Sequence, residues 1–230
     1  MNLVRAILCA VVLLGSALAQ PSSVSGIVTV EDHGKQVQNK SGAVIWLTSL
    51  DHSLPPKATD HVYRLAQKDK HFEPHLLVVT RGSLVEFPNH DPFFHNVFSM
   101  HDGVRFDLGL YERGAAKTVR FTKPGASYIF CNIHPEMSAV IMVMNTSLYA
   151  VTDRNGNYEI TGVPPGQYQL SVWYERALPE QLKELSRKVV VGSSPVTEAA
   201  LTLQQTPGIA EHHKNKFGME YESQSDYKTP

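Results

Sequence analysis

Three side chains that can bind a metal ion fall close together in the stretch PGASYIFCNIHPEM, residues 124–137. It begins as a strand rich in aromatic and branched residues and ends in a short turn after Cys131. Cys131, His134 and Met137 offer a thiolate, an imidazole and a thioether, a soft donor set that suits copper better than zinc. The alternative for this stretch alone is a buried cysteine beside a core methionine and an unrelated surface histidine.

A trigonal copper site needs a second histidine from elsewhere, and the stretch PNHDPFFHNVFS, residues 88–99, offers two. His95 begins a strand-like segment in which side chains alternate between faces, so it can face a site while Val97 packs in the core. His90 lies in a turn rich in proline and aspartate, where a solvated surface histidine is expected. We therefore expect His95 to be the partner of Cys131.

Two other groups of possible ligands are weaker candidates. His71, Glu73 and His75 bracket a proline just before a strand, and we expect no metal there. His212 and His213 lie in a polar stretch near the end of the chain, where a solvated pair is expected.

The N-terminus predicts export. Arg5 precedes a short apolar run, residues 6–14, and Ala-Leu-Ala follows at 17–19, so residues 1–19 are expected to be a cleaved secretory signal. We expect a periplasmic or secreted protein, without a transmembrane segment once the signal is removed. Removal takes Cys9 away and leaves Cys131 as the only cysteine. An exposed thiol outside the cytoplasm is readily oxidised, so a lone cysteine there favours a bound metal.

Charge and periodicity set the broad class. The formal net charge is -1, with no basic block, so we expect no nucleic-acid partner. Short strands bounded by Gly, Pro or Asn predict an all-β protein, and only residues 179–185 suggest a helix. Strands are expected at 24–30, 43–48, 76–80, 84–87, 117–121, 127–130 and 139–144. Residues 204–230 are polar and without periodicity, which predicts a flexible tail or extended arm.

The outer parts of the chain resemble the carboxypeptidase regulatory-like domain, a small transthyretin-like β-sandwich. The likeness is carried by VTDRNGNYEI at 151–160 and VPPGQYQLSV at 163–172, with opening strands resembling VSGIV at 24–28 and AVIWL at 43–47. Asn155-Gly156 suits a tight hairpin turn. Such domains are mostly binding or spacer modules. The resemblance implies one discontinuous domain made of residues 24–65 and 148–203.

The middle third of the chain, residues 68–145, resembles the cupredoxin family, most closely its amicyanin and pseudoazurin branch. The likeness is carried by FEP at 72–74, HNV at 95–97, Pro124-Gly125 and the Cys-x-x-His-x-x-Met loop at 131–137. It implies a Greek-key β-barrel or sandwich, inserted into the outer domain, with one mononuclear type 1 (blue) copper. His95, Cys131 and His134 would be equatorial ligands and Met137 a weak axial ligand. Asn96 would hold the two ligand-bearing loops together.

The resemblance also implies a function, one-electron transfer to an unidentified redox partner, with His134 as the exit for the electron. Four protein ligands leave no open position for a substrate, so we expect no enzyme. The alternatives are a copper storage, delivery or sensing module, and a non-catalytic β-sandwich that binds carbohydrate or protein. Chains of this composite kind are often labelled methylamine utilisation proteins, a label that does not by itself imply amine chemistry. An apolar surround for the metal is expected from Phe93, Phe94, Phe98, Phe130 and Ile133, which could equally be ordinary core residues.

Overall fold

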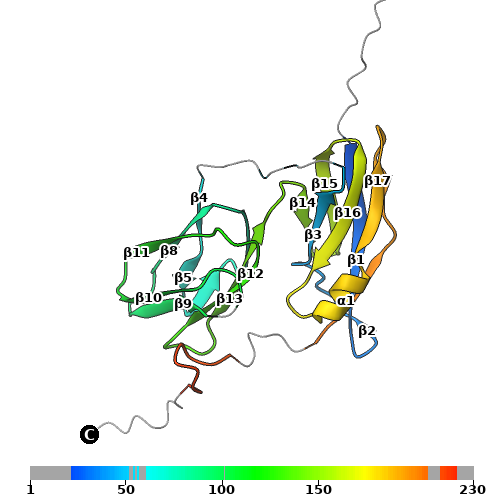
Figure 1. Cartoon of the computed structure of the whole chain (residues 1–230). Helices are drawn as coiled ribbons and strands as arrows, with labels where there is room; N and C mark the ends of the chain where they lie inside the picture. Colours follow the sequence, from blue (N-terminus) through cyan, green and yellow to red (C-terminus); the bar gives the residue numbers. More distant parts are fainter. Residues whose placement is uncertain are drawn as a thin grey trace, which may run out of the picture.

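The computed structural model describes residues 22–51, 54, 56, 61–100, 102–206 and 213–221, so the predicted signal lies outside the described residues. Nearly all of the regular structure is β, and Figure 1 shows two β-sandwiches side by side. We call them the first sandwich and the second sandwich. The fold is therefore all-β, as predicted.

The first sandwich contains strands from both ends of the chain. One of its layers contains β1 (Ser22–Asp32), β2 (Lys35–Gln36), β15 (Asn157–Val163), β18 (Val196–Thr197) and β19 (Leu201–Gln204). The other has the order β14 (Tyr149–Val151), β3 (Val44–Ser49), β16 (Gly166–Trp173) and β17 (Arg187–Val191). The predicted helix is α1 (Pro179–Glu184), which begins at a proline, as helices often do. Alternating residues of both layers form one buried core.

The second sandwich is built from the strands in between. Its larger sheet has the order β10 (Phe106–Tyr111), β9 (His95–Ser99), β12 (Gly125–Cys131), β13 (Ser138–Met144) and β7 (Leu76–Thr80). The smaller sheet has the order β11 (Ala116–Arg120), β8 (Leu84–Pro88) and β4 (Val62–Arg64), and β5 (Ala66–Lys68) pairs with β6 (His71–Glu73) as a hairpin. The seven predicted strands all occur, each within two residues of the expected bounds.

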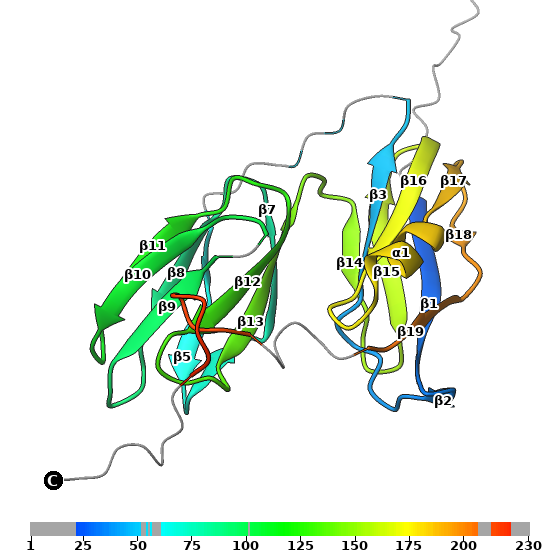
Figure 2. The ribbon, with the colours of Figure 1, turned by 60° about the horizontal axis from the view of Figure 1, so that its bottom comes forward.

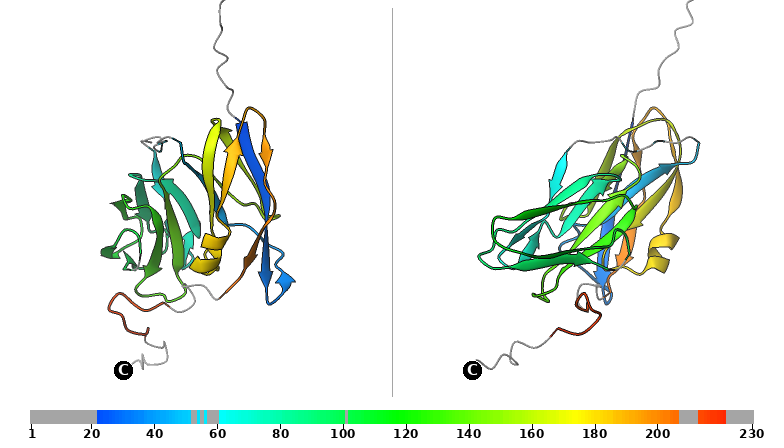
Figure 3. Two further views of the ribbon diagram at one scale, coloured as in Figure 1. Left: turned by 45° about the vertical axis from the view of Figure 1, so that its right-hand side comes forward. Right: turned by 60° about the vertical axis from the view of Figure 1, so that its left-hand side comes forward.

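Strand β13 is buried on both of its faces. Ile141 and Val143 point into the core of the second sandwich, whereas Met142 and Met144 pack against Val44 of the first sandwich. Two partly buried tryptophans, Trp46 and Trp173, complete this contact. The contact explains why residues 139–144 are continuously apolar instead of alternating, because a strand covered on both faces has no solvent side. Figure 3 shows the two sandwiches lying side by side.

A polar contact accompanies this interface. Nε2 of His75 lies 2.7 Å from a carboxylate oxygen of Glu175 in the first sandwich, and Nδ1 lies 3.1 Å from the carbonyl oxygen of Ser138. Both partners are acceptors, so both ring nitrogens must donate, and this requires the protonated imidazolium. The hydrogen bond to Glu175, with help from its charge and from Ser138, raises the pKa of His75 despite partial burial.

The Asn155-Gly156 turn joins β14 to β15 as the sequence predicts. Gly156 has a φ of 88°, and a Cβ at this position would lie 2.0 Å from the carbonyl oxygen of Val28. Asp153 accepts hydrogen bonds from the backbone of Asn155 and Asn157. The glycine is required both by its backbone conformation and by the close approach of β1.

Part of residues 204–230, the stretch expected to be a flexible tail or an extended arm, contacts the second sandwich. Residues 201–204 are strand β19, and residues 213–221, which we call the C-terminal segment, lie against the second sandwich (Figure 2). No helix among the described residues has the length and apolar character needed to cross a bilayer.

Candidate metal centre

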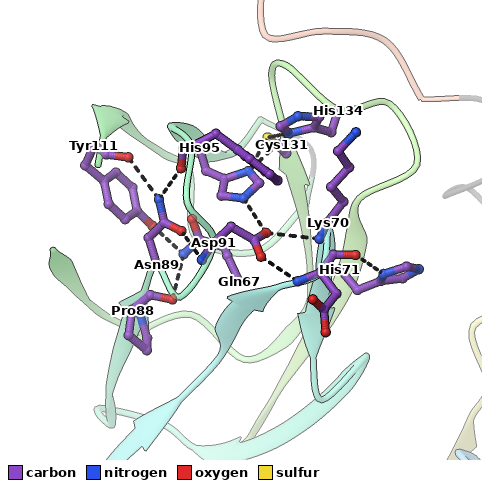
Figure 4. Close-up of polar contacts among 12 residues, drawn as sticks. Gln67, Lys70, His71, Pro88, Asn89, Asp91, His95, Tyr111, Cys131 and His134 are labelled. Carbon is purple, nitrogen blue, oxygen red and sulfur yellow. Dashed lines mark hydrogen bonds and ion pairs between the residues drawn. The ribbon is translucent and has the colours of Figure 1, made fainter. Parts of the chain in front are cut away.

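Three nitrogen and sulfur donors converge at one end of the second sandwich. Nδ1 of His95 lies 3.5 Å from Sγ of Cys131 and 3.2 Å from Nδ1 of His134, and the Cys131 sulfur lies 3.7 Å from Nδ1 of His134. Figure 4 shows the three side chains directed toward one another. The pairing predicted between His95 and the Cys131 loop is therefore present in the fold. Among the described residues, no other group of three His, Cys, Asp or Glu side chains comes together in this way.

The spacing of these atoms fits a metal ion. A point equidistant from three atoms at these separations lies about 2.0 Å from each, close to the ~2.0–2.1 Å of metal–imidazole bonds and slightly short of the ~2.3 Å of metal–thiolate bonds. His95 and Cys131 are fully buried, and His134 is partly exposed. Three donors so placed would hold a small ion at the edge of the protein.

Strand pairing and a short turn bring the donors together. Cys131 is the last residue of β12, and β12 pairs with β9, which His95 begins. The following loop returns toward the sheet. The backbone N–H of Met137 donates to the backbone carbonyl oxygen of His134, and the backbone N–H of Cys131 donates to the carbonyl oxygen of Met137. Met137 is fully buried and packs in the same core cluster as Cys131. Its assignment as an axial ligand stays a prediction.

The backbone of Asn96 makes the link between the two ligand-bearing segments. Its carbonyl oxygen accepts a hydrogen bond of 2.9 Å from the N–H of Asn132. Its side-chain amide instead donates to Asp107 at 2.6 Å. The side chain therefore acts through Asp107, a residue that the sequence pattern did not single out.

A buried carboxylate fixes the orientation of His95. Oδ2 of Asp91 lies 2.8 Å from Nε2 of His95, and its two oxygens also accept hydrogen bonds from the backbone N–H groups of Asp69 and Lys70 (Figure 4). Because the carboxylate is an acceptor, Nε2 must carry the proton, and Nδ1 is left with a free lone pair facing Cys131. Burial alone would raise the pKa of Asp91, but the hydrogen bonds from Lys70, His95 and Asp69 outweigh it and keep the pKa below its usual value.

The turn of the β5–β6 hairpin supplies two of these donors. Asp69 and Lys70 have φ values of 54° and 57°, the left-handed conformation that a two-residue hairpin turn of this type requires at both positions. Non-glycine residues adopt it at a cost, which the two hydrogen bonds to Asp91 offset. The hairpin is thus tied to the residue that orients His95.

Protonation acts in opposite directions on two of the donors: the lowered pKa of His134 leaves its lone pair free for a metal, whereas the raised pKa of Cys131 makes a metal compete with a tightly held proton. Burial raises the pKa of the Cys131 thiol, against the opposing effect of backbone N–H groups of Asn96, Ile133 and His134. Burial and the neighbouring His95 lower the pKa of His134. The free site therefore holds a neutral imidazole and a thiol, and a soft cation would displace the thiol proton to gain a thiolate ligand.

The five apolar residues expected around the site divide into three groups. Phe93 contacts both histidine rings, with centroid distances of 5.3 Å to His95 and 5.4 Å to His134. Phe98 and Phe130 belong to a separate buried cluster on the other face of the sheet. Phe94 and Ile133 are 54% and 44% exposed. Of these five, Phe93 is the one that lines the donors directly.

The other candidate residues differ in their exposure. His90 is exposed, and so are His71, Glu73 and His75. The prediction of a solvated His213 is wrong, because its ring stacks on Phe130 with centroids 4.1 Å apart. His212 lies outside the described residues.

Sequence reasoning missed Asp91 and the docking of the C-terminal segment. Asp91 precedes His95 by four residues, but nothing in the sequence indicates that the distant turn at 69–70 will hold it in place. A carboxylate close to a candidate ligand histidine is a signal that could have been used, because such histidines are commonly oriented by one.

A comparison with protein-family models finds no match, and one with curated proteins finds none either. Among solved structures, a copper-containing nitrite reductase (NirK) from Thermus scotoductus SA-01 is 25% identical with a TM-score of 0.35, and the match covers 39% of this chain and 25% of that one. A purple cupredoxin from Nitrosopumilus maritimus is 19% identical with a TM-score of 0.33, covering 36% of this chain and 99% of that one. A reduced amicyanin mutant is 20% identical with a TM-score of 0.35, covering 43% and 98%. At such scores we rest the metal inference on the donor geometry alone.

Proposed function

We propose that this chain is an exported blue copper protein that transfers single electrons. The observation that supports the proposal is the triangle formed by Nδ1 of His95, Sγ of Cys131 and Nδ1 of His134. Two imidazoles and a thiolate, with the buried Met137 nearby as a weak fourth donor, form the ligand set of a type 1 copper site. In this proposal the second sandwich is a cupredoxin domain.

The surrounding residues suit electron transfer. Copper would supply a one-electron redox couple, and the protein would hold its ligands in one arrangement for both oxidation states. Asp91 orients His95, and the two backbone hydrogen bonds of the 131–137 loop fix the return to Met137. Little rearrangement on gain or loss of an electron keeps the barrier to transfer low. Four protein donors leave no open position for substrate, so we propose a carrier and not an enzyme.

One end of the site is accessible. His134 is partly exposed and its neighbour Ile133 is 44% exposed, whereas His95 and Cys131 are buried. We propose that a redox partner protein contacts this end and that the electron passes through the ring of His134. The first sandwich would be a carboxypeptidase regulatory-like domain that holds the copper domain as a spacer, outside the cytoplasm.

The test is the optical and paramagnetic resonance spectrum of the protein loaded with cupric ion. We expect an intense visible thiolate-to-copper band, lost in Cys131→Ser and in His95→Ala. Met137→Leu should keep the band and shift the reduction potential, and His90→Gln, at an exposed histidine, should match the wild type. A colourless copper complex would refute the proposal. A coloured protein that gives up its copper rapidly to a cuprous chelator would indicate storage or delivery instead of electron transfer.

A further inference from the structure

The C-terminal segment contacts three consecutive residues at the end of β12. The ring of His213 stacks on Phe130, the hydroxyl of Tyr221 donates to the carbonyl oxygen of Cys131 at 2.8 Å, and the backbone N–H of Lys216 donates to the side chain of Asn132 at 3.0 Å. In Figure 2 this segment, drawn in red, lies beside β9 and β12. It therefore covers the strand end that carries the candidate thiolate ligand.

A fourth contact reaches the segment that carries His95. Nζ of Lys216 lies 2.8 Å from one carboxylate oxygen of Asp107, and the other oxygen of Asp107 accepts the side-chain amide of Asn96. Asn96 follows His95 in β9. One short segment thus contacts the backbone of Cys131 directly and the neighbour of His95 through Asp107, although it lies about 80 to 120 residues away from the two donors in the sequence.

The segment has its own internal structure. Oδ1 of Asn215 accepts hydrogen bonds from the N–H groups of Phe217 and Met219, and the N–H of Asn215 donates to the carbonyl of Met219. Nε2 of His213 lies 3.1 Å from the hydroxyl of Tyr221, so the two ends of the segment are also joined. A segment held in this way presents its contacts to the sandwich in a fixed arrangement and loses less entropy on docking.

We propose that residues 213–221 are a brace that fixes the end of β12 and thereby keeps the Cys131 sulfur buried. The inference rests on the proposed copper site only for the second of the two tests below. The first test measures the accessibility of the Cys131 thiol in the metal-free protein. His213, Lys216 and Tyr221 are positioning residues, because they contact the residues beside the donors or the backbone of Cys131, and not the donor atoms. The bond to the Cys131 carbonyl fixes the peptide plane from which the loop to His134 departs.

The first test uses the metal-free full chain and a bulky aromatic disulfide reagent. The Cys131 thiolate attacks the reagent, forms a mixed disulfide and releases a coloured thiolate that is counted by absorbance. We expect slow labelling of the wild type and about tenfold faster labelling of the combined variant Tyr221→Phe with Lys216→Ala, the change expected when two hydrogen bonds that close the site are lost. Lys214→Ala, at an exposed residue of the same segment, is the matched control and should label at the wild-type rate.

The second test uses the copper-loaded protein. The combined variant should keep the visible band, because no ligand is changed, but lose copper to a chelator about tenfold faster than the wild type. When Lys216→Arg takes the place of Lys216→Ala in the combined variant, copper loss should be slower again, because a cation stays near Asp107. Equal labelling rates in wild type, control and combined variant would overturn the brace. Faster labelling of the combined variant, together with a wild type that shows no visible band, would refute the copper site and leave the brace supported.

Discussion

Asp91 and His95 form a buried carboxylate–imidazole pair, with 2.8 Å between Oδ2 and Nε2 and almost no exposure of either side chain. The pair sets which nitrogen of His95 faces the Cys131 sulfur, and it is itself held by the turn of a hairpin on another part of the sandwich. Orientation of the candidate ligand thus depends on residues more than twenty positions away in the sequence.

Replacing Asp91 should weaken metal binding without removing a donor. Asp91→Asn keeps the shape of the side chain but removes its charge, and an amide can present its NH2 group to Nε2 and favour the wrong tautomer of His95. We expect about a 10- to 100-fold loss in copper affinity with the visible band retained at saturation. The measurement is a competition titration against a chelator of known affinity. Asp102→Asn, at an exposed carboxylate of the same sandwich, should change the affinity little, and an equal loss in both variants would contradict the role of Asp91.

The His75–Glu175 ion pair should make stability depend on pH in a defined direction. The pKa of His75 is raised in the folded protein, so its stabilising contribution is fully present below the unfolded pKa of about 6.5 and is lost as pH rises through the folded value. The difference in free energy of unfolding between wild type and His75→Gln should therefore be largest in mild acid and shrink with rising pH. His75 is half exposed, so solvent screening keeps the effect small.

Urea unfolding of the metal-free protein at several pH values measures this difference. His90→Gln serves as the control, since it removes an exposed histidine from the same sandwich and should show no such trend. A difference between wild type and His75→Gln that stays constant with pH would contradict the assignment.

Truncating a methionine at the contact between the sandwiches should destabilise the protein. Met144 is buried against the first sandwich, and Met144→Ala leaves a cavity that neither sheet can close easily. We expect a loss of about 2–5 kcal/mol in the free energy of unfolding. Met219→Ala removes the same atoms from a side chain that is 59% exposed and should cost less than about 0.5 kcal/mol. Similar losses in the two variants, measured by urea denaturation, would show that Met144 is not packed as described.

Alanine substitutions at two glycines allow the cost of a steric clash to be compared with the cost of backbone strain alone. Gly162 has a φ of 69° with open space where a Cβ would lie, so Gly162→Ala should cost about 1–2 kcal/mol through strain alone. Gly156 has a similar φ, but its Cβ would meet the Val28 carbonyl at 2.0 Å. Gly156→Ala should therefore be clearly more destabilising, and thermal unfolding of both variants measures the difference. Equal melting temperatures would mean that β1 moves away without cost.

Sequence patterns predicted the strands and the cluster of donors because both depend on local spacing. The β-branched and aromatic runs mark strands such as 139–144, and the Cys-x-x-His-x-x-Met spacing places three donors on one loop. Their meeting with His95 was expected because His95 begins a strand-like segment, the family resemblance implied the same residue, and the fold brings His95 next to Cys131.

Other parts of the site could not be read from the sequence because they depend on contacts between distant segments. Asp91 lies in a turn rich in proline, and its role comes from the backbone of Asp69 and Lys70. The C-terminal segment has no hydrophobic periodicity, because it docks through a few polar atoms and one stacked ring. A single hydrogen bond to a backbone carbonyl produces no pattern that can be recognised in the sequence.

The double burial of β13 limits how far the two halves of this protein can be treated as separable modules. Excising residues 62–145 for study in isolation would expose Met142, Met144 and Val140 to water in a row along a sheet face. Such a fragment would tend to self-associate, because an exposed apolar face binds other apolar surfaces. A soluble version of the second sandwich alone therefore needs polar replacements on that face. A fusion that exchanges the first sandwich for another domain needs to cover the face with an equally apolar surface.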